Sequence, residues 1–217
     1  MRVLLIISSL GLLLMTIAHT QANQAKAKPA VRNVTLKGTI VDVHNFFELA
    51  TKREGYVPGD ADVCSSRAFV AKSAMYAFLE TPGNAEKLES VELDSDVILK
   101  GKLLTSGALL HIESISPSPR PLNIRTARFQ KHAGTAVRLS GRNLCQCALK
   151  LYKIPHSCAL GHRHHLQFSG KETRIYHYLP TSAGRALFLG KDSHGKTVNV
   201  EAIILPGQFV LVKSVEK

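Results

Sequence analysis

Two halves of this sequence repeat the same short patterns in the same order, about one hundred residues apart. The matched stretches are apolar and strand-like: 34–38 (VTLKG) with 137–141 (VRLSG), 75–79 (MYAFL) with 175–179 (IYHYL), 97–99 (VIL) with 198–200 (VNV), and 112–115 (IESI) with 212–215 (VKSV). Chance produces one such match, but hardly several in one order. We therefore interpret the chain as a tandem duplication, in which one small fold is built twice.

Each copy has the pattern of short strands. Residues 34–43 alternate around Gly38, which indicates a strand with a bulge or bend at the glycine. Residues 65–78 are typical of a short helix followed by a strand, and 96–102 and 108–115 of a hairpin turning through T-S-G. Because closing a small sheet into a barrel removes its edges, we predict a mainly β protein with two tandem OB-like small β-barrels. An SH3-like barrel and a small sandwich are the alternatives.

We predict a leader before the first copy and a linker between the two copies. Residues 1–22 combine Arg2, an apolar run and small residues at 20–22, which is typical of a secretory signal peptide; an uncleaved anchor is the alternative. We therefore predict an exported protein, periplasmic or extracellular, without a transmembrane segment in the mature chain. The predicted parts are a disordered leader at 23–33, a first domain at 34–116, a proline-rich basic linker at 117–134 and a second domain at 135–217.

A cluster of metal-ligand residues lies in the second copy. Three of the four cysteines and four of the ten histidines fall within residues 143–168. Thiolate and imidazole are ligands that zinc and copper prefer. Alternate residues of a strand face the same side, so Cys145 and Cys147 can bind one ion together. We predict a tetrahedral zinc or copper site made of Cys145, Cys147, Cys158 and His162, with His164 as the alternative fourth ligand.

The first copy offers a weaker set at the matching positions. With Gly38 superposed on Gly141, Asp42 and His44 fall where the second copy has its first two cysteines, and Cys64 is the candidate for the part of the third. A carboxylate, an imidazole and a thiolate can also hold a metal ion. The alternative is that the first copy is purely structural.

The second copy also resembles a known group of proteins. Its N-L-C-Q-C-A-L from Asn143, then Cys158, then G-H-R-H over 161–164 is similar to the N-L-C…C-A-L…C…G-H-R-H signature of exported bacterial small β-barrel proteins of planctomycete type. The first copy resembles a related exported module that opens with G-x-V-V-D and a following cysteine, where this chain has Asn45 and Phe46. The resemblance implies an exported protein with a cysteine and histidine site.

A thiol–disulfide redox function is the alternative for the same residues. Cys145 and Cys147 would form the redox pair, and Arg142, Lys150 and the histidines would favour the thiolate. Only one residue separates the two cysteines, so their disulfide ring would be strained and oxidising. This alternative leaves Cys158 and the histidines without a role.

A second alternative is binding to an anionic surface or polymer. The formal charge is +12, and the linker carries a run of basic residues: Arg120, Arg125, Arg128 and Lys131. A solvated surface is the plainer explanation of that run. Aromatic residues make up 6% of the chain, with no tryptophan, which is too few for base stacking, so we do not expect nucleic acid binding. The sequence has no serine–histidine–acid order and no phosphate-binding loop, and we expect a binding protein rather than an enzyme.

Overall fold

The computed structural model describes residues 31–48, 52, 54–130, 135–146, 164–168, 174–190 and 193–216, and for 128, 130 and 164–168 it describes the backbone only. The predicted signal peptide at 1–22 lies outside these ranges, as do residues 23–30 of the predicted leader. Within them, no helix has the length and apolar character needed to cross a membrane.

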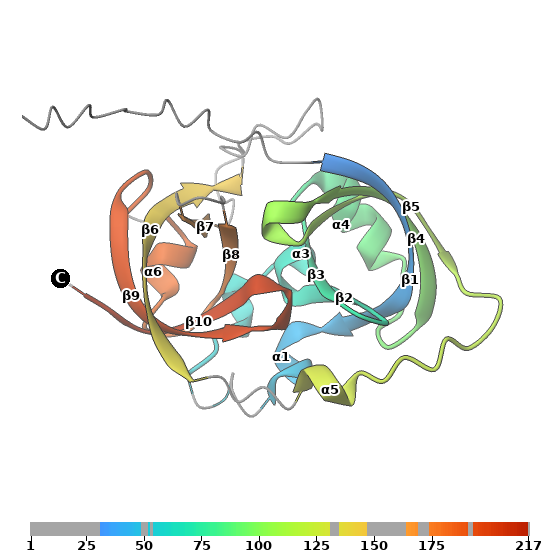
Figure 1. The fold of residues 1–217 in the computed structure, drawn as a ribbon, viewed down its shortest axis with the longest axis horizontal. Helices are drawn as coiled ribbons and strands as arrows, with labels where there is room; N and C mark the ends of the chain where they lie inside the picture. The colour runs from blue at the N-terminus through green and yellow to red at the C-terminus, as the bar shows by residue number, and fades with distance from the viewer. Residues whose placement is uncertain are drawn as a thin grey trace, which may run out of the picture.

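The N-terminal half folds into a closed β-barrel of five strands, at the right of Figure 1. Its strands are β1 (Val31–Asp42), β2 (Arg67–Ala71), β3 (Met75–Phe78), β4 (Asp96–Leu104) and β5 (Leu109–Pro117). They follow the order β1-β2-β3-β5-β4, and β4 pairs with β1 to close the ring. β3 and β5 run parallel, and the other pairs are antiparallel. The short helices of this half are α1 (Val43–Phe46), η1 (Pro58–Asp60), α3 (Val63–Ser66), α4 (Pro82–Glu89) and η2 (Thr105–Gly107).

The C-terminal half forms a second closed sheet, at the left of Figure 1. Its strands are β6 (Ala136–Cys145), β7 (His164–Phe168), β8 (Arg174–Leu179), β9 (Thr197–Leu205) and β10 (Phe209–Val215). They follow the order β10-β8-β7-β6-β9, with β8 and β10 parallel and the other pairs antiparallel. The helices after the first barrel are α5 (Ala127–Gln130), α6 (Arg185–Phe188) and η4 (Pro206–Gln208).

Gly38 is required by a close approach of two strands. A Cβ atom at this position would collide with the ring of Phe69 and lie 2.5 Å from the carbonyl oxygen of Val70 on β2. Only glycine leaves room for that contact. The bend predicted at this glycine is therefore a site of tight packing inside the first barrel.

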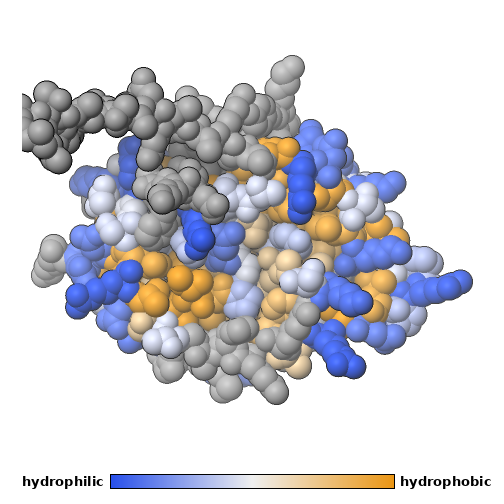
Figure 2. All heavy atoms as spheres, in the orientation of Figure 1, coloured by the Kyte–Doolittle hydropathy of each residue, from blue (hydrophilic) through white to orange (hydrophobic). Residues whose placement is uncertain are grey.

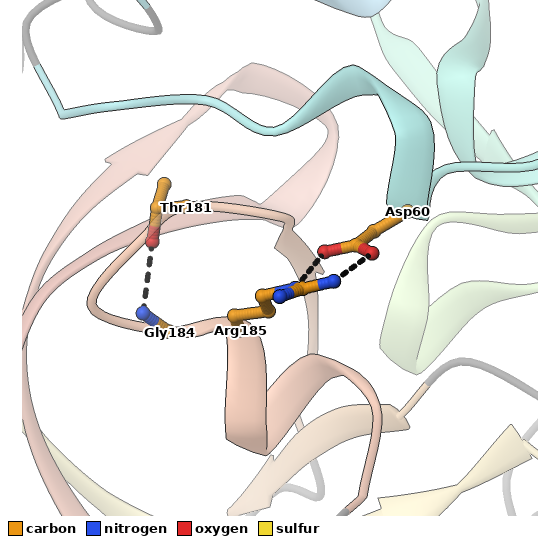
Figure 3. Close-up of polar contacts among 4 residues, drawn as sticks. All are labelled: Asp60, Thr181, Gly184 and Arg185. Atoms are coloured by element: carbon orange, nitrogen blue, oxygen red, sulfur yellow. Dashed lines mark hydrogen bonds and ion pairs between the residues drawn. The ribbon is translucent and has the colours of Figure 1, made fainter.

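A threonine begins the helix that follows the third strand of the first barrel. Thr81 Oγ1 accepts from Asn84 N, and Pro82 at the first helical position adds a residue whose missing N–H is not needed there. The second barrel repeats this turn: Thr181 Oγ1 accepts from Gly184 N at 3.1 Å, as Figure 3 shows. Thr81 is therefore the N-cap of α4, whereas Thr181 makes the same local bond one turn earlier, to the residue Gly184 that precedes α6.

One apolar cluster runs through both barrels. Met75 and Leu109 of the first barrel pack in the same buried cluster as Ile175, Leu179 and Phe209 of the second. Separate clusters fill the interior of each barrel. Apolar surface shared across the junction holds the barrels together by removing that surface from water. On the face shown in Figure 2, hydrophobic residues gather over both barrels and hydrophilic ones project at the outer edges.

The predicted linker is anchored to the barrels. Phe129 on α5 is buried in the cluster that both barrels share, and Ile124 packs against it. Leu122 N donates to Asp96 Oδ2 at 2.8 Å, which fixes the segment to the start of β4. Figure 1 shows the segment passing from β5 around the first barrel to α5. Arg120, Arg125 and Arg128 therefore stand on a backbone that the structure describes.

The observed strands differ from the predicted ones at two boundaries and in the number of strands in one segment. β1 begins at Val31, inside the predicted leader, because β4 extends far enough to pair Leu104 with it. β5 ends at Pro117, inside the predicted linker. The described pairing of β5 with β3 covers only Leu109 and Leu110. The missing N–H of Pro117 therefore removes no described hydrogen bond between β5 and β3. Residues 65–78 contain two strands, β2 and β3, where we predicted one. The predicted hairpin is confirmed as β4 and β5, joined through η2.

Candidate functional site

Two of the predicted metal ligands are partners in the sheet. β6 ends at Cys145, and its Cα partner on the antiparallel strand β7 is His164, the first residue of that strand. The Cys145 side chain is buried. Residues 146–163 are therefore the connection that leaves and returns at this pair. The other predicted ligands, Cys147, Cys158 and His162, fall in that connection and lie outside the described residues.

Gln146 fastens the start of this connection to the first barrel. Its Oε1 accepts from Glu80 N at 2.8 Å, and both residues are buried. β6 ends at Cys145, directly before Gln146. The contact joins the cysteine end of β6 to the segment between β3 and α4 of the first barrel.

A small cavity lies beside Gln146, between the two barrels. Its polar lining comes from Cys64 and Glu80 on one side and from His177 and Tyr178 on the other, and its volume is about 20 Å³, too small for a substrate. Burial raises the pKa of the Cys64 thiol and of the Tyr178 hydroxyl, so both stay neutral at pH 7. A neutral, buried thiol is a poor nucleophile, and this cavity is not a catalytic site.

His177 makes a structural contact across the junction. Its Nε2 donates to the carbonyl oxygen of Gly107 at 2.6 Å. Burial lowers the pKa of His177 to about 4, against the smaller opposing effect of the bond to Gly107. The imidazole is therefore neutral at pH 7 and serves as a hydrogen-bond donor from the second barrel to the first.

The structure does not bring Asp42, His44 and Cys64 together. Asp42 caps α1 by accepting from Asn45 N at 2.8 Å, and His44 stacks on Tyr56 with ring centroids 4.4 Å apart. Cys64 is buried in the core of the first barrel. Among the described residues, no three Cys, His, Asp or Glu side chains form a group that could hold a metal ion. Each of the three residues has a local structural contact in place of the metal role.

The basic residues of the linker are partly described. Arg120 and Arg125 are exposed, and Arg128 lies on α5, where the structure describes its backbone only. Lys131 lies outside the described residues. The two described side chains are accessible to an anionic partner.

The sequence did not reveal the polar contacts at the junction between the two barrels. Arg185 donates from Nε and Nη2 to the two carboxylate oxygens of Asp60, at 2.6 and 3.0 Å, which joins α6 to η1 (Figure 3). Backbone bonds add to it, with Val57 N donating to Pro180 O and Ser182 N to Gly55 O. These partners lie more than one hundred residues apart in sequence, so no local sequence pattern predicts the contacts.

Comparison with protein-family models, with curated proteins and with solved structures finds no match for this chain.

Proposed function

We propose that this chain is an exported metal-binding protein that holds zinc or monovalent copper through three cysteines and one histidine. The ligands are Cys145, Cys147, Cys158 and His162, with His164 as the alternative to His162. Export rests on the signal-peptide pattern of residues 1–22.

The pairing of Cys145 with His164 carries the proposal. Partners across an antiparallel pair have Cβ atoms about 4.5–5.5 Å apart. Cys147 follows Cys145 by two residues, and His162 precedes His164 by two. Four of the five proposed ligands are therefore within two residues of one cross-strand pair, and only Cys158 has to be brought in by the connection.

The ligand chemistry favours a closed site. Three thiolates and one imidazole are a standard complement for structural zinc, and thiolate-rich sites also suit monovalent copper. Binding would tie the connection 146–163 to the end of β6 and the start of β7, so the metal would contribute to folding of this part of the second barrel. Through the hydrogen bond between Gln146 and Glu80, metal binding would also stabilise the contact with the first barrel.

Metal content of the purified full chain tests this proposal, together with counting of its reactive thiols. We expect one metal ion per chain, lost in Cys158→Ser and in the double variant His162→Ala/His164→Ala. The matched control is Cys64→Ala, which removes a buried thiol of the first barrel and keeps the metal. Metal binding that survives both ligand variants would contradict the proposal. A metal-free protein with a disulfide between Cys145 and Cys147 would favour the redox alternative.

We further infer that the two halves are tandem OB-like barrels that arose by duplication. In support, β1 and β6 hold matching places in their sheets: Gly38 pairs with Val97, and Gly141 pairs with Val198. The parallel pairs also match with an offset of one hundred, Ala77 with Leu109 and His177 with Phe209. An experimental structure of the full chain tests this inference through superposition of the two halves.

A further inference from the structure

An open cleft lies where the two barrels meet. It is lined by Thr105 and Ser106 of η2, by Arg174 and Tyr176 of β8, and by residues 204–208 at the end of β9 and in η4. We call it the junction cleft. Its volume is about 430 Å³, within the range of about 300–1,000 Å³ that is usual for small-molecule sites, and junctions between domains are common places for such sites.

Among the described residues that line the junction cleft, the one charged side chain is the guanidinium of Arg174. Arg174 is exposed, and its side chain has no hydrogen bond or ion pair with another described residue. A guanidinium presents several donors in a planar fork that matches a carboxylate in a bidentate way. The cleft therefore favours an anion with that geometry.

The rest of the lining suits an apolar body. Ile204, Leu205 and Pro206 form an aliphatic wall, and Tyr176 adds an aromatic ring. The Oγ atom of Ser106 is buried and has no hydrogen-bond partner. A polar group of a ligand would supply that partner, since a buried hydroxyl without one is costly. Inorganic anions would leave the apolar wall unused.

Both barrels shape the junction cleft. With its amide nitrogen facing the two carbonyl groups, Gln208 donates to Ile175 O at 2.6 Å and to Ser106 O at 3.1 Å, and so ties η4 and β8 of the second barrel to η2 of the first. The position one hundred residues before Arg174 is Ala74. The cation is therefore a feature of this cleft and not of the repeated pattern.

We propose that the junction cleft binds a small carboxylate that carries an aromatic or branched aliphatic body. The carboxylate accepts from Arg174, and the body packs between Tyr176 and the aliphatic wall. None of the described residues that line the cleft is a ligand of the proposed metal site.

The test is a ligand-observed NMR titration of the full chain with 3-phenylpropanoate. Its neutral amide is the matched analogue, and acetate and inorganic phosphate separate charge from apolar contact. We expect the acid to bind about tenfold to a hundredfold more tightly than the amide, as the loss of charge-assisted hydrogen bonds predicts. Arg174→Met should remove that difference, and Ser106→Ala should weaken binding severalfold. Lys37→Met, which removes an exposed cation from β1, should leave binding unchanged.

Two further measurements complete the test. Thermal unfolding of each variant checks that it folds, and a short peptide that ends in phenylalanine carries the same two groups on a longer chain. Binding of that peptide as well supports the shared chemistry and assigns a peptide C-terminus as the source, whereas binding of the free acid alone assigns a small molecule. Equal binding of acid and amide, binding of acetate or phosphate as tight as that of the acid, or wild-type affinity in Arg174→Met would overturn the proposal. So would a lack of binding of the acid to the wild-type chain.

Discussion

Gly107 and Ile175 lie so close that a Cβ atom on the glycine would be 3.1 Å from the Cβ of the isoleucine. The same contact recurs between Gly207, one hundred residues after Gly107, and Met75, one hundred residues before Ile175. A Cβ atom on Gly207 would lie 3.2 Å from Cγ of Met75. The turn between the fourth and fifth strands of each barrel thus packs on the third strand of the other. The junction is therefore reciprocal, since each barrel contributes a turn and a strand of the same order to it.

Alanine at either glycine should loosen this junction. We expect Gly107→Ala and Gly207→Ala each to lower the free energy of unfolding by about 1–3 kcal/mol, through overpacking in both and also through the positive φ of 78° at Gly207. Gly59→Ala is the control, because nothing lies within 4 Å of the added atom. Urea unfolding measures all three. Equal stability of the three variants would contradict the reciprocal packing.

The ion pair between Asp60 and Arg185 should stabilise the junction modestly. The Asp60 side chain is 10% exposed and that of Arg185 is 56% exposed, so water screens part of the attraction. We expect a coupling free energy of about 1 kcal/mol in a double-mutant cycle of Asp60→Asn and Arg185→Met, smaller at high salt. Additive effects of the two substitutions would show that the pair contributes nothing.

His177 should make the stability of the chain depend on pH. Its pKa is lowered to about 4 in the folded state by burial, against about 6.5 when unfolded. The stabilisation is therefore complete above about pH 6.5 and is lost as pH falls toward 4, by up to about 3 kcal/mol. His177→Gln keeps a donor for Gly107 O and removes the titration. Urea unfolding between pH 4 and 8 should give a shallower pH profile for this variant, and an unchanged profile would place the effect elsewhere.

Any polyanion binding should lie on the linker and fall steeply with salt. Arg120 and Arg125 are exposed on a segment that Phe129 anchors. Reversing both charges with Arg120→Glu/Arg125→Glu should abolish retention on an anionic resin at low salt, because such contacts depend on counterion release. The single control Lys37→Glu alters an exposed cation on β1. Retention that falls equally in the control would indicate a response to net charge alone.

Many of the strands were predictable because local sequence patterns, which recur in both halves of the chain, indicate them. The alternation around Gly38 and the turn 105–107 identify strands by residue type and spacing. The junction was not predictable in the same way, because Asp60 and Arg185, or Gly107 and His177, meet only after both barrels have closed. The docking of Phe129 was missed for a related reason: Leu122, Ile124 and Phe129 are irregularly spaced in a basic, proline-rich segment and give no periodic signal.

The candidate metal site also combines features that local sequence predicts with contacts that only the folded chain shows. Strand alternation predicted that Cys145 and Cys147 face the same side, but β6 ends at Cys145 and Cys147 lies outside the described residues. The register of the sheet makes His164 the direct partner of Cys145. The first-copy set of Asp42, His44 and Cys64 looked equivalent in a linear alignment. It fails in space because His44 lies on α1, stacked on Tyr56, while Cys64 enters the core.

X-ray absorption at the metal edge of the purified full chain tests the central proposal most directly. Zinc held by Cys145, Cys147, Cys158 and one histidine predicts three sulfur neighbours near about 2.3 Å and one nitrogen at about 2.0–2.1 Å. Cys158→Ser should bind no metal, so its purified chain should show no absorption at that metal edge. A first shell made of oxygen and nitrogen alone, or the same three sulfur neighbours in Cys158→Ser, would contradict the proposed site.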